Sequence, residues 1–219
     1  MAHPKNPNTL LTQIQQTRAA SAALGMAAVE LPAGPLAMEE GEWAYFPMGA
    51  LICLGPPHAA QALAVLGSRA CVFPMPPEAG VWQAHVMVPG WVCRVDWRPV
   101  REDPQRYAAW LWATTEATQA LMGQMGQWAF CLQHHTPAQA LASWLLHCAE
   151  QSASSDFQLH LSAMPQPMRH ALQRWQADAI GPLRESGFEV VDGVVQALDP
   201  LRLRSLACTC HQRMPGHQA

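Results

Sequence analysis

The repeat pattern of the sequence changes at Asp103-Pro104, and this change constrains the fold more than any other feature. Between residues 29 and 98, short apolar runs are separated by breakers such as Gly55-Pro56-Pro57 and Pro89-Gly90. Runs at roughly ten-residue spacing predict the antiparallel strands of a sandwich or roll. After Pro104 no proline occurs before Pro137, which allows a long helix. The chain is therefore predicted to be an α+β protein with its β part first.

The long helix is predicted to begin at Asp103, an N-cap residue followed by proline at the first helical position. Apolar residues then recur in sevens, with threonine at two steps, in a pattern typical of an a/d seam. Gly123 and Gly126 each weaken such a helix by about 1 kcal/mol relative to alanine, so it needs packing partners. Two partners stay open, the helix's own β domain or a second copy of the helix. The seam favours a homodimer, and its predicted interface residues are Tyr107, Leu111, Thr114, Thr118, Leu121, Met125 and Trp128, with Leu132 continuing the series.

The last part of the chain is predicted to be a helical unit closed by a hairpin. Thr136-Pro137 repeats the cap signature and opens a helix with Leu141, Trp144, Leu145 and Cys148 on one face. Further on, Asp192-Gly193 joins two β runs, and this dipeptide suits a type I′ turn because both central positions need positive φ. The outline is that of a winged helix. Three parts follow: an antiparallel β-roll over 1–102, a dimerisation helix over 103–133 and a winged-helix-like domain over 134–219.

Composition excludes several classes of protein. Charged residues are 13% of the chain and the formal net charge is -3, so bulk charge does not attract nucleic acid. No apolar run approaches the roughly 18 residues that a membrane-spanning helix needs, and the first thirty residues hold no secretory apolar region. We therefore expect a cytoplasmic protein without a membrane partner. No nucleophile elbow, zinc-protease motif or phosphate-binding glycine loop is present, so no enzyme is predicted.

The seven cysteines are scattered, odd in number and without a C-x2-C pair. This pattern argues against a disulfide framework and against a zinc ribbon. Most are expected to be small buried apolar side chains. Cys208-Thr209-Cys210-His211 could chelate a metal through two thiols and an imidazole, but the sequence shows no partner ligands beside it. No metal site is therefore predicted.

Short motifs follow one another in a fixed order over nearly the whole chain. They are Asn6 to Leu11, Gly41-Glu42 with Ala44-Tyr45-Phe46-Pro47, Phe130-Cys131 with His134, Ala140 to Leu146, Leu161-Ser162, Glu185-Ser186-Gly187, and Leu198-Asp199 with Cys208-Thr209-Cys210. Together with the order of roll, long helix and helical unit with hairpin, they resemble the Crp/Fnr family of bacterial transcription regulators. The resemblance implies a dimeric, DNA-binding regulator with a cyclic-nucleotide-binding-like sensor roll and a winged helix-turn-helix.

Departures from the family limit what its members' ligands imply here. The arginine-serine pair that binds the ligand phosphate in cyclic-nucleotide members has no counterpart, because residues 76–88 hold no arginine. We therefore expect no cAMP binding. The first cysteine is Cys53, so the N-terminal cysteine cluster of Fnr-type iron-sulfur sensors is missing as well. The effector and any cofactor stay unknown: His58, His85 and Trp82 could serve a haem or another ligand, but a surface imidazole or a packed ring is the favoured interpretation.

The DNA-reading segment departs from the family too. The resemblance places Ser162 as the cap of the first motif helix and the second helix from His170–Leu172 to Glu185, where Gly181-Pro182 would interrupt it. Pro167 would then lie inside the first helix, at a cost of about 3 kcal/mol. Alternatively the boundaries shift, and one helix runs from Pro167 to Ile180. On that helix the candidate DNA contacts are Arg169, Gln173 and Gln176 on one face, flanked by Arg174 and Gln166, because arginine can pair with guanine and glutamine with adenine.

Charge leaves two functions open. Residues 157–187 carry three arginines against two acidic residues, and Glu189 and Asp192 on the hairpin have the wrong sign for phosphate. The favoured function is a DNA-binding regulator of Crp/Fnr type. The alternative is a regulator-like dimer that has lost specific DNA contact and acts through protein or ligand contacts.

Overall fold

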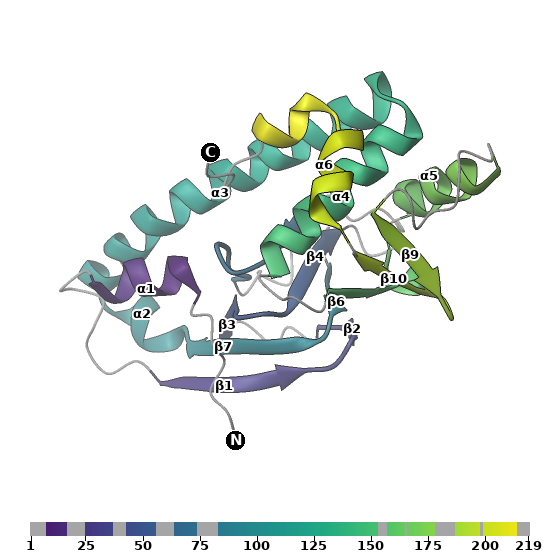
Figure 1. Ribbon diagram of the computed structural model, residues 1–219. Coiled ribbons are helices and arrows are strands. Elements are labelled where there is room, and N and C mark those ends of the chain that lie inside the picture. Colours follow the sequence, from purple (N-terminus) through teal and green to yellow (C-terminus); the bar gives the residue numbers. More distant parts are fainter. Residues whose placement is uncertain are drawn as a thin grey trace.

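The computed structural model confirms the predicted α+β architecture, with a β-roll, a long helix and C-terminal helices around a small sheet (Figure 1). It describes residues 8–16, 25–36, 43–55, 64–73, 83–152, 157–164, 166–177, 187–197 and 199–213. Within these ranges, no helix combines the length and the apolar character that crossing a bilayer would require.

The roll consists of two antiparallel sheets. The first has the order β1-β7-β3, made of β1 (Met26–Leu31), β7 (Gly90–Asp96) and β3 (Trp43–Pro47). The second has the order β2-β6-β4-β5, made of β2 (Gly34–Pro35), β6 (Gln83–Val88), β4 (Leu51–Gly55) and β5 (Ala64–Leu66). Inward side chains such as Phe46 and Ile52 are fully buried. The apolar runs of the sequence are thus the strands, and the prolines and glycines separate them.

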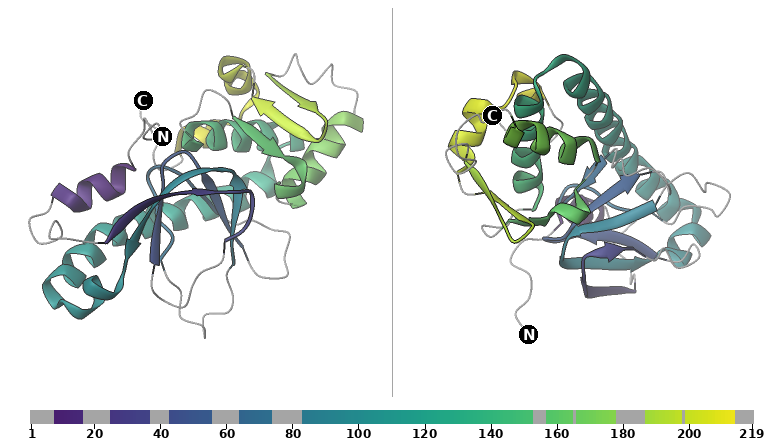
Figure 2. Two further views of the ribbon diagram at one scale, coloured as in Figure 1. Left: turned by 90° about the horizontal axis from the view of Figure 1, so that it is seen from below. Right: turned by 90° about the vertical axis from the view of Figure 1, so that its right-hand side faces the viewer.

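Two short helices flank the start of the long one. The helix α1 (Thr9–Gln16) contacts α3 (Pro104–His134), and α2 (Arg98–Glu102) leads into it. Asp103 caps α3 as predicted: its Oδ1 accepts the backbone N–H groups of Gln105 at 3.0 Å and Arg106 at 3.2 Å. At 31 residues, α3 is about 46 Å long. It runs along one side of the roll and reaches the C-terminal unit (Figures 1 and 2).

One face of α3 packs on the chain's own roll and, near the helix end, on the C-terminal unit. The buried residues of the helix are Trp110, Thr114, Gln124, Trp128 and Cys131. Trp110 joins an aromatic cluster, with its ring centroid 5.7 Å from that of Phe46 and 5.4 Å from that of Trp97. Of the two partners that the sequence left open, this face takes the β domain.

The C-terminal unit begins with α4 (Pro137–Ser152), which lies between the roll and the remaining elements. Residues 140–148 of α4 are all buried. The four apolar residues predicted to share one face, Leu141, Trp144, Leu145 and Cys148, are all buried, and burial extends to the other faces because α4 contacts strands β4 and β5 as well as α5 and α6. A helix surrounded in this way is apolar all round. Its polar members have partners inside the protein, as Ser143 shows below.

The rest of the unit forms the predicted wing together with one extra strand. The elements are β8 (Gln158–His160), the short 3-10 helix η2 (Leu161–Ala163), α5 (Gln166–Ala177), β9 (Phe188–Val191), β10 (Val194–Ala197), α6 (Pro200–Leu206) and the 3-10 helix η4 (Thr209–Arg213). The sheet order is β8-β10-β9. Asp192 has φ 49° and Gly193 φ 76°, so both turn positions are left-handed as a type I′ hairpin requires. This hairpin and α1 lie at opposite ends of the molecule (Figure 2).

Candidate nucleic-acid interface and dimer face

The candidate reading helix is α5, the α-helix that the structure describes between β8 and β9. It begins at Gln166, so Pro167 is its second residue, where the missing N–H has no intrahelical partner to lose. The expected penalty of about 3 kcal/mol at Pro167 is therefore wrong. A 3-10 turn stands at Leu161–Ala163, where the resemblance began its first motif helix at Ser162. The shifted-boundary alternative is the closer one, although Gly181-Pro182 and the expected end at Ile180 lie outside the described residues.

One side of α5 is buried and the other is polar and exposed. Met168, Ala171 and Leu172 are buried in the cluster that contains much of α4. Gln166, His170, Gln173 and Arg174 are exposed. Arg169 is half-buried, and its Nε has no hydrogen-bond partner among the described residues. Gln176 is on α5, but its side chain is not described. The exposed face therefore centres on Gln173 and Arg174 rather than on Arg169.

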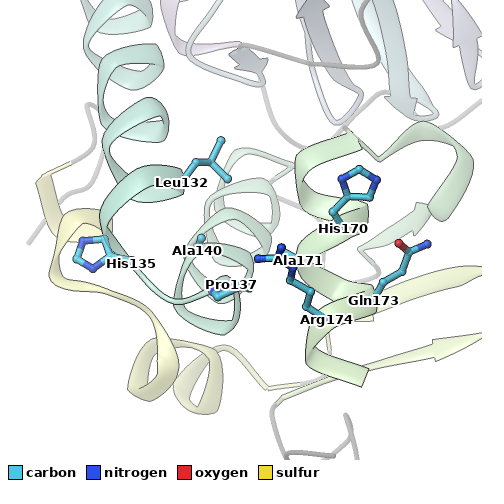
Figure 3. Close-up of a pocket in the computed structure, with 8 residues that line it drawn as sticks. All are labelled: Leu132, His135, Pro137, Ala140, His170, Ala171, Gln173 and Arg174. Atoms are coloured by element: carbon cyan, nitrogen blue, oxygen red, sulfur yellow. The ribbon is translucent and has the colours of Figure 1, made fainter. Parts of the chain in front are cut away.

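A pocket of about 560 Å³ opens between α5 and the junction of α3 with α4. It is lined by Leu132, His135, Pro137, Ala140, His170, Ala171, Gln173 and Arg174. Figure 3 shows His170, Gln173 and Arg174 coming from α5, and His135 on the other side of the α3–α4 junction. Two of the predicted DNA contacts, Gln173 and Arg174, thus border a recess of their own chain.

The charges around α5 are sparse. On α6, Arg202 lies 3.4 Å from Asp199 and Arg204 lies 3.2 Å from Glu150, so acidic neighbours offset both guanidinium groups. On the wing, Asp192 is exposed at the tip and Glu189 is half-buried. Among the side chains that the structure describes on α5, α6 and the hairpin, Arg174 and in part Arg169 are the candidate cations for phosphate.

An apolar stripe runs along the outer face of α3. It consists of Tyr107, Leu111, Met122, Leu132 and the half-buried Met125, with exposed Thr118 among them, and we call it the α3 stripe. Successive spacings of four, seven, four, three and seven residues keep these side chains on one face. Met122 is 66% exposed, although the heptad count skipped it in favour of Leu121. Leu121 instead packs against the core of the roll, and Thr114 and Trp128 are buried in their own chain.

The C-x-C segment lies beside ligand candidates that the sequence did not connect with it. Cys208 and Cys210 gather with Cys131 and His135 at the end of α3. His211, the third member of the sequence candidate, points elsewhere, with its Nε2 3.1 Å from Glu150 Oε2. Among the candidates for an effector site, His85 is half-buried on β6, whereas His58, Trp82 and residues 76–82 lie outside the described ranges.

Of three comparisons with known proteins, the one with solved structures finds the same fold. A scan of protein-family models finds no match to the sequence, and neither does a search of curated proteins. Solved structures do match: a CRP-family transcriptional regulator from Thermus thermophilus has a TM-score of 0.55 and 16% identity, covering 87% of this chain and 97% of that one.

Two further structures superpose to a similar extent. A transcriptional regulator of the Crp/Fnr family from Eubacterium rectale has a TM-score of 0.56 at 10% identity, over 83% of this chain and 89% of that one. A CooA mutant from Carboxydothermus hydrogenoformans has a TM-score of 0.52 at 10% identity, over 92% and 95%. The chain therefore has the fold of the Crp/Fnr transcription regulators.

Proposed function

We propose that this protein is a dimeric DNA-binding transcription regulator of Crp/Fnr type that acts in the cytoplasm. The observation that carries the proposal is the polar face of α5 beside the β9–β10 hairpin, on a unit joined by α3 to a β-roll. A helix with exposed arginine and glutamine can present these groups to base edges, while a wing and nearby cations contact the backbone. Two of the structural neighbours are named as transcriptional regulators of this kind.

The dimer in this proposal forms through the α3 stripe. A monomer would leave Leu111 52% and Met122 66% exposed on a helix of 31 residues. A second α3 packed along the same face would cover both side chains and set two reading units side by side. Because two half-sites bind one DNA together, even a modest contact of each unit contributes to a common affinity.

The roll is proposed to sense a ligand other than cAMP. Residues 76–88 offer no arginine for a ligand phosphate. The effector itself stays open.

The acidic wing favours a second candidate function. Asp192 is exposed at the hairpin tip, and the α6 arginines lie against carboxylates, so the described part of the unit offers few positive charges to phosphates. Affinity for DNA depends strongly on the number of phosphates neutralised. A regulator-like dimer that acts through protein or ligand contacts is the proposal that remains if DNA binding fails.

The deciding experiment is retardation of genomic DNA fragments at low salt. We expect salt-sensitive binding by the unaltered protein, and loss of it when Arg169 and Arg174 are both replaced by alanine. Each lost phosphate contact should lower the salt slope by about 0.9. Arg101→Ala is the matched control, because Arg101 is an exposed arginine on α2.

If the unaltered protein shows salt-sensitive binding to none of the genomic fragments, the proposal of a DNA-binding regulator fails and the regulator-like dimer without specific DNA contact replaces it. Binding by the double variant that equals that of the Arg101→Ala control would leave DNA binding in place but refute the assigned residues.

A further inference from the structure

We propose that Cys131, His135, Cys208 and Cys210 bind one zinc ion in a closed tetrahedral site. This inference goes beyond the proposed function and does not depend on it. The site joins the end of α3 to the C-terminal segment, and we call it the Cys3His site.

Two local spacings bring the four ligands together. Cys131 lies in the last turn of α3. His135 comes four residues later, directly after the helix ends, so both side chains lie on one side of the helix end. Cys208 lies between α6 and η4, and Cys210 is the second residue of η4, so the C-terminal segment lies over the end of α3 (Figure 1). The backbone N–H of His135 donates to the carbonyl of Cys131 at 3.1 Å, and this bond holds the histidine next to the helix.

The spacing of the Cys131 and Cys208 sulfurs matches a tetrahedral metal site, and the other two ligand atoms lie near enough to share one ion. Cys131 Sγ and Cys208 Sγ are 3.7 Å apart, and His135 Nε2 lies 3.2 Å from Cys210 Sγ. All four ligand atoms lie within 4.8 Å of one another. Zinc–sulfur bonds of about 2.3 Å at the tetrahedral angle place two sulfurs about 3.8 Å apart, and a sulfur and a nitrogen about 3.6 Å apart. The pair at 3.7 Å is far from a disulfide, which would bring the sulfurs to about 2.05 Å.

Burial and ligand type favour zinc in a structural role. All three cysteines are buried and the histidine is half-buried. Soft thiolates with an imidazole are a ligand set that zinc takes in closed four-coordinate sites. Four protein ligands leave no position open for a substrate, so the ion would stabilise the fold rather than act in catalysis.

Neighbouring polar groups are placed to hold the sulfurs. Ser143 Oγ on α4 is 3.1 Å from Cys208 Sγ and accepts the backbone N–H of Cys208 at 3.0 Å. Gln127 Nε2 is 3.8 Å from Cys131 Sγ. Donors of this kind orient metal-bound thiolates. Burial opposes ionisation of Cys208, but the hydrogen bonds, with that from Ser143 foremost, outweigh it and lower its pKa.

The site would connect three parts of the molecule. Through Cys131 and His135 it holds the end of α3, through Cys208 it reaches Ser143 on α4, and through the C-x-C segment it fixes the chain that follows α6. Burial raises the pKa of Cys131, and zinc takes cysteine as the thiolate, so a thiol that binds the ion gives up its proton. Zinc binding is therefore expected to release protons.

The test is metal content and metal replacement in the full-length protein. Protein depleted of metal and reloaded with zinc should hold one zinc per chain after desalting, and Cys210→Ser should hold less than a tenth of that. Cobalt(II) in place of zinc should give the intense visible absorption of tetrahedral cobalt with thiolate ligands. Cys71→Ser is the matched control, because it removes a thiol from a different cluster and should keep full zinc content.

A second pair of variants protects the test against loss of folding. His135→Cys supplies another zinc ligand and should retain one zinc per chain, whereas His135→Ala should lose it while its circular dichroism stays that of the parent. The proposal is overturned if reloaded parent protein holds no stoichiometric zinc, if Cys210→Ser binds as much as Cys71→Ser, or if the site as isolated carries iron-sulfur absorption or a Cys131–Cys208 disulfide.

Discussion

Replacement of Gln124 by leucine should weaken the packing of α3 on the roll and cost the protein about 1–5 kcal/mol of stability. Among the described strands, β5 is the last of its sheet, so none of them pairs with the outer backbone groups of Val65. Gln124 takes the place of that strand: its Oε1 accepts the N–H of Val65 at 3.1 Å, and its Nε2 donates to the carbonyl of Val65 at 3.2 Å. The same amide nitrogen also contacts His147 Nε2 on α4.

The expected cost follows from what leucine leaves behind. Val65 and Gln124 are 4% and 5% exposed, so the two freed backbone groups cannot reach bulk water. Each unsatisfied buried group costs about 1–3 kcal/mol, and the apolar surface that leucine buries returns about 1 kcal/mol of the total.

Urea unfolding at fixed protein concentration measures this cost, with Gln119→Leu as the control. Gln119 is exposed on the same helix, so its replacement should change stability by less than about 0.5 kcal/mol. A loss below about 1 kcal/mol for Gln124→Leu, or one equal to that of the control, would refute the role given to this amide.

Three further predictions concern association, packing and metal. In sedimentation at micromolar concentration we expect the parent protein and Gln119→Asp to be dimers and Met122→Asp to be a monomer. A monomeric parent, or a Met122→Asp variant that associates like the parent, would contradict the α3 stripe as an interface. Gly67→Ala should lower stability by about 1–3 kcal/mol, because an added Cβ would lie 2.7 Å from the Cβ of Gln151. Gly126→Ala, on open helix surface, should raise stability by up to about 1 kcal/mol. Equal effects of the two variants in thermal unfolding would contradict this packing. Chelation of zinc should lower stability by about 2.7 kcal/mol relative to protein with free zinc at a hundred times its dissociation constant, and an unchanged unfolding midpoint would contradict this linkage.

Local signals in the sequence predicted the elements that depend on local chemistry. The run Trp43–Pro47 is β3 residue for residue, Asp103 caps α3, and Asp192-Gly193 forms the hairpin turn. Each depends on a few neighbouring residues, either through a cap, a turn that needs positive φ, or a run bounded by breakers. Tertiary surroundings do not enter, so one sequence suffices.

The features that the sequence did not predict depend on what packs against an element. Whether Pro167 breaks a helix depends on where α5 begins, and that start follows from the way α5 lies on α4. The burial of α4 on all sides requires both the roll and α6. The sequence gives no signal that Gln124 is buried, because a glutamine in a helix is normally expected on the surface. Its burial depends on the edge strand β5, whose backbone groups it binds.

The Cys3His site could not be predicted from the sequence for the same reason, because its ligands come together only through packing. Cys131 and Cys208 are 77 positions apart, and the C-x-C segment alone carried no indication of partner ligands. Cys131 and Cys208-Thr209-Cys210 belong to separate motifs of the family resemblance, far apart in the sequence. Only the packing of the C-terminal segment over the end of α3 makes them one site.

The helix α3 has two apolar faces, one packed on the chain itself and one exposed, which a heptad count does not distinguish. Thr114, Leu121 and Trp128 face the molecule's own interior, while Leu111 and Met122 face outward from the same helix. A continuous helix transmits a displacement of one face to the other, since its backbone hydrogen bonds keep it rigid. A ligand that shifts β5 would act on α3 through Gln124, and would thereby move the α3 stripe. If the roll senses a ligand and the chain associates through α3, as proposed above, then one helix couples the two events, and Gln124→Leu is expected to weaken that coupling.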